Sequence, residues 1–86
     1  MSASRKTYYV VQTFVAVEYE DHPVPEAALE APSATAALRL AKTIAQTKAG
    51  VIAFSRTGDF ERGEFDDAMI LQSYGVVPNV ADLYGE

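Results

Sequence analysis

The chain has 86 residues and no cysteine, and its 12 acidic and 7 basic side chains give a formal net charge of −5. This length predicts one domain over residues 1–86, and the cysteine count excludes disulfides and thiol chemistry. The acidic balance argues against direct binding of nucleic acid through its phosphates. Because 49% of the residues are hydrophobic, we expect a folded protein. The lack of cysteine fits a reducing cytoplasm, where we place the protein. We expect no cofactor.

The first predicted element is a β-strand over residues 7–19. Its β-branched and aromatic side chains alternate between two faces, and neither face is purely polar. Gln12 and Thr13 interrupt the apolar run, which argues against a secretion signal, and no stretch of the sequence is long enough to span a bilayer. We therefore expect no membrane partner.

The next two elements are a weak edge strand and a helix. Residues 24–32 are bracketed by prolines, which an edge strand tolerates. Ser33 is a plausible N-cap, and apolar residues then recur at helical spacing as far as Ile44. Gly50 is predicted to end the helix as a left-handed cap residue.

Two further strands are predicted over residues 51–56 and 67–75, which gives the order ββαββ. Connection rules favour a four-stranded antiparallel sheet in the order 2-1-3-4 with the helix on one face, a two-layer α+β sandwich. The tail over residues 76–86 either covers the other face or mediates dimerisation.

The loop between the last two strands is the most distinctive segment. The stretch "TGDFERGEFDDA" has neither the acidic spacing of a calcium-binding EF-hand loop nor the Lys of a phosphate-binding P-loop. We interpret it as a β-hairpin first and a recognition loop second, with a loose divalent-cation site as a minor alternative. The predicted partner-binding residues are Arg56, Asp59, Phe60, Glu61, Arg62, Glu64 and Phe65.

Two phenylalanines in so polar a loop need an explanation. Phe60 and Phe65 either staple the loop to the helix N-terminus, which we favour, or dock a partner. Arg56 is expected to pair with Asp66 or Asp67 across the hairpin.

The sequence predicts no enzyme. His22 is the only histidine and precedes Pro23 in an acidic turn, so a serine triad would have to recruit it from across the domain. Paired carboxylates for acid–base chemistry need a pocket that raises one pKa, which a domain of this size rarely builds. We assign no catalytic, cofactor-binding or metal-binding residue.

Several segments resemble a group of short, uncharacterised bacterial proteins. The signature "AFSRTGD…GEFDDA", a "YYVVQTF" opening, an "ALRLA" helix and a "YGVVP" strand end are similar to those proteins over nearly the whole chain. The helix start "SATAALRLA" departs from the group by lacking two acids. The group has no assigned activity, so the resemblance implies relatives and not a function.

Two functions remain open. The first is a non-enzymatic protein–protein interaction or regulatory module that binds another protein, with a homodimer through the open sheet face. That face is expected to expose Tyr8, Val10, Phe14, Ala16 and parts of Met69 or Leu71. The alternative is an acidic, phage-type inhibitor of nucleic-acid machinery, such as an anti-CRISPR protein or DNA mimic, although the helix is basic and the two acidic clusters lie apart.

Overall fold

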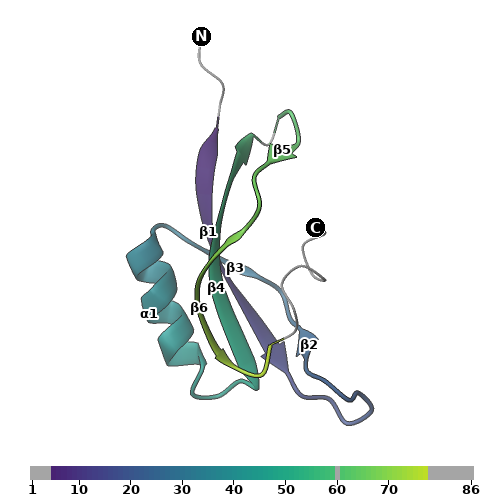
Figure 1. The fold of residues 1–86 in the computed structure, drawn as a ribbon. Coiled ribbons are helices and arrows are strands. Elements are labelled where there is room, and N and C mark those ends of the chain that lie inside the picture. The colour runs from purple at the N-terminus through teal and green to yellow at the C-terminus, as the bar shows by residue number, and fades with distance from the viewer. Residues whose placement is uncertain (1–4, 60, 78–86) are drawn as a thin grey trace.

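The computed structural model describes residues 5–59 and 61–77. It is an α+β structure with one helix and an antiparallel sheet, which confirms the predicted class (Figure 1). The elements in chain order are β1 (Lys6–Val15), β2 (Val24–Pro25), β3 (Leu29–Ala31), α1 (Ala34–Ile44), β4 (Gly50–Asp59), β5 (Glu64–Phe65) and β6 (Met69–Gly75).

Two long strands form the centre of the sheet. β1 and β4 pair antiparallel from Lys6 opposite Gly58 to Phe14 opposite Gly50. β2 and β3 both pair with the other edge of β1, and β5 and β6 both pair with β4. The sheet therefore has six strands and differs from the four-strand layout expected from the sequence.

The outer strands are short because the chain interrupts their ladders. Pro25 in β2 and Pro32 just after β3 have no backbone N–H to donate, which limits pairing along this edge. On the other side of the sheet, residues 66–68 separate β5 from β6, and the β4–β6 register shifts between Ala53 and Phe54. A periodicity of two cannot reveal such interruptions, because it describes side-chain direction and not hydrogen bonding.

The helix begins as predicted and ends earlier than predicted. Ser33 is extended (φ −157°), and its Oγ accepts a hydrogen bond from the backbone N–H of Ala36 at 3.1 Å. α1 ends at Ile44, and Gly50 is the first residue of β4, so its predicted role as a helix cap is wrong. A Cβ at Gly50 would lie 2.0 Å from the carbonyl oxygen of Val76, so close chain approach requires glycine there. Among the described residues no helix is long and apolar enough to cross a membrane.

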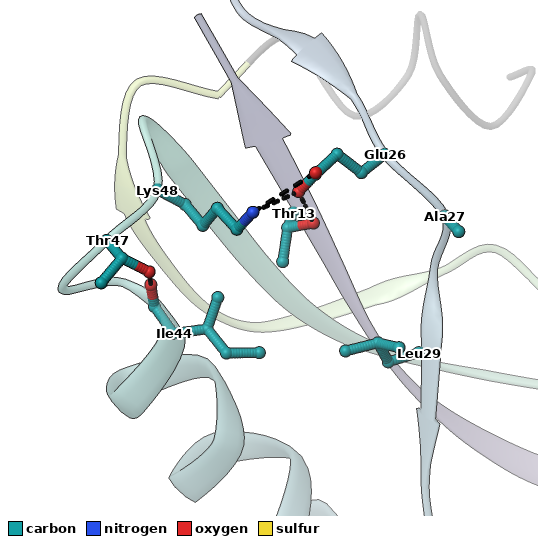
Figure 2. Close-up of a pocket in the computed structure, with 7 residues that line it drawn as sticks. All are labelled: Thr13, Glu26, Ala27, Leu29, Ile44, Thr47 and Lys48. Carbon is teal, nitrogen blue, oxygen red and sulfur yellow. Dashed lines mark hydrogen bonds and ion pairs between the residues drawn. The ribbon is translucent and has the colours of Figure 1, made fainter.

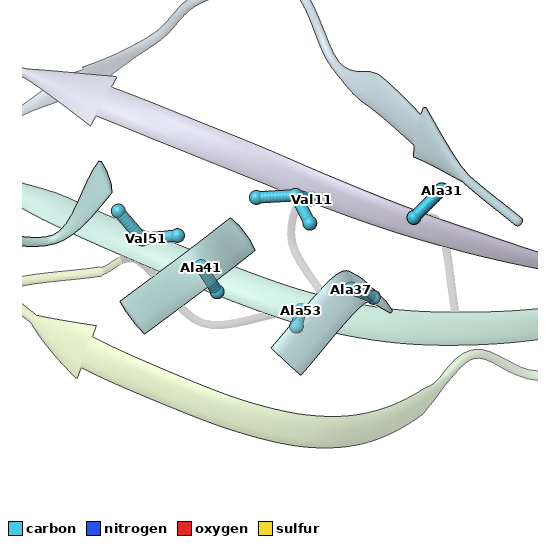
Figure 3. Packing of buried hydrophobic residues seen from close by; sticks show 6 residues of the cluster. All are labelled: Val11, Ala31, Ala37, Ala41, Val51 and Ala53. Carbon is cyan, nitrogen blue, oxygen red and sulfur yellow. The ribbon is translucent and has the colours of Figure 1, made fainter. Parts of the chain in front are cut away.

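Small side chains pack α1 against one face of the sheet. Three alanines, Ala37 and Ala41 of α1 and Ala53 of β4, are fully buried, and they let the helix approach the sheet closely. The cluster they belong to is drawn in Figure 3 and consists of Val11, Ala31, Ala37, Ala41, Val51 and Ala53.

Larger side chains form a second cluster of Phe14, Ile52 and Phe54. Phe14 is 0% exposed, so the expectation that it lies open on the surface is wrong. The side chain of Val77, at the start of the predicted tail, packs against this cluster. Residues 78–86, which make up the rest of that tail, lie outside the described part of the chain.

Candidate functional site

The predicted recognition loop is an arm of the sheet, which we call the hairpin arm (residues 56–67). Asp59 pairs with Glu64 and Gly58 pairs with Phe65, and the N–H of Asp66 donates to the carbonyl of Thr57 at 2.8 Å. Figure 1 shows β5 beside the far end of β4, beyond the part of the sheet that α1 covers. The sequence therefore identified the hairpin correctly, and the arm stands clear of the helix.

A buried carboxylate organises the turn at the tip of the arm. Asp59 is 3% exposed, and its Oδ1 accepts hydrogen bonds from the backbone N–H groups of Glu61 at 2.9 Å and Arg62 at 3.4 Å. The Arg62 Nε lies 3.9 Å from its Oδ2. Gly63 completes the turn with φ +67°, a conformation that glycine adopts without strain. Asp59, predicted as a contact residue, thus positions the tip from inside.

Phe65 fixes the base of the arm. Its ring covers Gly58, where an added Cβ would lie 2.2 Å from Phe65 Cδ1. The ring also lies 6.4 Å from that of Tyr8, and the Arg56 guanidinium carbon lies 5.5 Å from its centroid. These partners belong to β1 and β4, so the predicted staple between Phe65 and the helix N-terminus is replaced by packing on the arm's own strands.

Two arginines contact Asp66: Arg56 of β4 and Arg5, which lies just before β1. The Arg56 Nε donates to the Asp66 carbonyl at 3.0 Å, whereas the Asp66 carboxylate pairs with Arg5 at 2.8 Å. Arg56 therefore does contact Asp66, one of its two predicted partners, but it binds the main-chain carbonyl. The Asp66 carboxylate pairs with Arg5 instead. Sequence spacing could not find Arg5, because it lies 61 residues away.

The predicted contact residues divide into three groups. Glu61, Arg62 and Glu64 are exposed at the tip, Arg56 and Phe65 are half-buried at its base, and Asp59 is buried. Phe60 lies outside the described residues. Within residues 5–59 and 61–77, no three His, Asp or Glu side chains gather closely enough to hold a metal ion.

A second candidate region, which the sequence did not indicate, lies between the end of α1 and the edge of β1. It is an open pocket of about 340 Å³, shown in Figure 2, and it is lined by Thr13, Glu26, Ala27, Leu29, Ile44, Thr47 and Lys48.

The polar end of this pocket is a compact network. Thr13 donates to Glu26 Oε1 at 2.7 Å, and Lys48 Nζ lies 3.0 Å from the same oxygen. The hydrogen bond from Thr13, followed by that from Lys48 and its positive charge, lowers the pKa of Glu26 below its ordinary value of 4.5. A carboxylate that is already satisfied in this way suits a structural role, because its partners stabilise the charged form that an acid catalyst must give up.

Comparisons of the chain with protein-family models, with curated proteins and with solved structures find no match. The fold and the site define a small α+β protein with a projecting hairpin arm and an open pocket that is polar at one end.

Proposed function

We propose that this protein is a non-enzymatic interaction module that binds another protein through the tip of its hairpin arm. The observation that supports this most is the contrast within the arm between a fixed frame and exposed charges. Asp59, Phe65 and Arg56 contact the arm and the neighbouring β1, whereas Glu61, Arg62 and Glu64 are exposed to solvent.

The hydrogen bonds that Asp59 accepts within the turn favour recognition. A loop already held by the Asp59 carboxylate loses little conformational entropy when a partner binds, so more of the contact energy appears as affinity. The tip carries both acidic and basic side chains, so it favours a partner with complementary charges. Such exposed charges at an interface chiefly set the orientation of the partner and the association rate.

The acidic-inhibitor alternative gains less support. A phosphate mimic needs a continuous acidic stripe, but cations interrupt the acidic side chains of the arm. Arg5 pairs with Asp66 and Arg62 lies beside Asp59. At the other acidic cluster Lys48 pairs with Glu26.

The test is a photo-crosslinking capture in host lysate with a reactive group placed at the tip. Three forms are compared: the wild type, a tip variant (Glu61→Ala/Arg62→Ala/Glu64→Ala) and a control variant in the other exposed turn (Glu18→Ala/Tyr19→Ala/Glu20→Ala). We expect one protein to be cross-linked by the wild type and by the control and lost with the tip variant. Equal capture by all three forms would contradict the proposal, and so would capture by none.

A further inference from the structure

The two edges of the sheet are protected to very different degrees. The edge formed by β2 and β3 is short and contains Pro25, with Glu26 and Glu30 at its exposed positions. Short strands, prolines and charges are the devices that keep an edge from pairing with another chain.

β6 lacks the strongest of these devices. It has seven residues, and the sequence has no charged residue and no proline from Ala68 to Val77. Within the described residues β6 is hydrogen-bonded to β4 alone, and Figure 3 shows it, in yellow-green, as the outermost strand on the side away from β3. The register shift near Phe54 is the one irregularity in its pairing with β4.

Two further features of β6 favour pairing with a strand of another chain: exposed apolar side chains and a main-chain carbonyl with a long hydrogen bond. Met69 is 69% and Ile70 44% exposed, which is unusual for large apolar residues on neighbouring positions. The Gln72 side-chain amide donates to the Ser73 carbonyl at 3.3 Å, a long bond that a backbone N–H from another strand could replace.

We infer that β6 is a strand-pairing edge and that its partner is a second copy of this chain, joined antiparallel to form one continuous sheet. Each copy carries a net charge of −5, so most of its surface opposes self-association. The uncharged edge is where two copies meet without placing like charges opposite each other. A two-fold axis makes such an interface self-complementary, so that the same strand serves on both sides. This surface is separate from the hairpin tip, and the inference does not depend on the proposed function.

The proposal is tested by sedimentation equilibrium of the full chain over about a hundredfold range of concentration. The main variant, Met69→Lys/Gln72→Lys, places charges on the edge while it reduces the net negative charge, so general repulsion cannot explain a loss of association. The matched control is Leu29→Lys on β3, where Leu29 is 43% exposed.

We expect a monomer–dimer equilibrium for the wild type and the control, tightened by added salt, and at least about tenfold weaker association for the β6 variant. Amide hydrogen exchange checks the interface, because residues 69–75 should become slower to exchange as concentration rises. Ser73→Lys provides a second β6 variant if the first fails to fold. A monomeric wild type, equal weakening by the control, or protection confined to β1 would overturn the inference.

Discussion

The body and the hairpin arm of this protein are stabilised by different interactions. In the body, α1 and the long strands bury small apolar side chains on one face and Phe14, Ile52 and Phe54 on the other. In the arm, beyond the helix, the contacts are a buried carboxylate, arginine hydrogen bonds and one ring lying over a glycine. At this end of the sheet β4 lies between β1 and β5, with Gly58 opposite both Lys6 and Phe65. The difference teaches that a narrow end of a sheet beyond the helix relies on specific polar contacts among the described residues, because it has less apolar surface to bury than the body.

The largest expected effect comes from the body. Phe14→Ala removes a ring that is 0% exposed, and it should lower the free energy of unfolding by about 3–5 kcal/mol because a cavity remains. Urea denaturation followed by circular dichroism measures this. Tyr19→Ala, at a residue 92% exposed, is the control and should change stability little. A loss for Phe14→Ala no greater than for Tyr19→Ala would show that the second cluster does not stabilise the body.

The next largest effect lies at the base of the arm. Gly58→Ala places a methyl group 2.2 Å from Phe65 Cδ1 and 2.4 Å from the carbonyl oxygen of Glu64, so the ring and the β5 main chain must both move, at a cost of about 1–3 kcal/mol. Chemical shifts should change at Tyr8 and Phe65 and stay constant in α1. In Phe65→Ala the same glycine substitution should cost less, because the contact with the ring is gone while that with the Glu64 carbonyl remains, and a double-mutant cycle measures the difference. Additive effects would show that the two residues are not coupled.

A smaller effect is expected at the tip. Asp59→Ala removes the acceptor of two backbone N–H groups and should cost about 0.5–2 kcal/mol, as loss of a capping side chain does. Faster amide exchange at Glu61 and Arg62 is the local readout. Asp59→Asn keeps an acceptor oxygen and should restore much of the protection, and Asp67→Ala, at an exposed position, is the control. Unchanged exchange in Asp59→Ala would mean that the turn is ordered by something else.

The smallest effect concerns Glu26 and pH. Its folded pKa is lowered by Thr13 and Lys48, so the stabilisation is fully present above its ordinary pKa of 4.5 and is lost as pH falls through the lower, folded value. Carboxyl NMR titration should show the pKa of Glu26 below 4.5 in the wild type and closer to 4.5 in Thr13→Val. An unshifted Glu26 in the wild type would refute the network.

The sequence by itself determined the elements whose patterns are local. The alternation after Thr7 gave the first strand, Ser33 and the apolar spacing gave the helix start, and "TGD" with Gly63 gave the hairpin. These predictions succeed because side-chain period, capping and turn chemistry act between residues close in the chain.

Only the tertiary structure decided the contacts between distant segments. The main chain of Val76 lies so close to residue 50 that only glycine fits there. Phe65 lies over Gly58, and Arg5 pairs with Asp66. Phe14 is buried on the face expected to be open, and Glu26 meets Thr13 and Lys48 at a pocket. None of these follows from spacing, because each depends on how strands register and which segments cross. A one-residue change of register would move every strand side chain to the opposite face of the sheet.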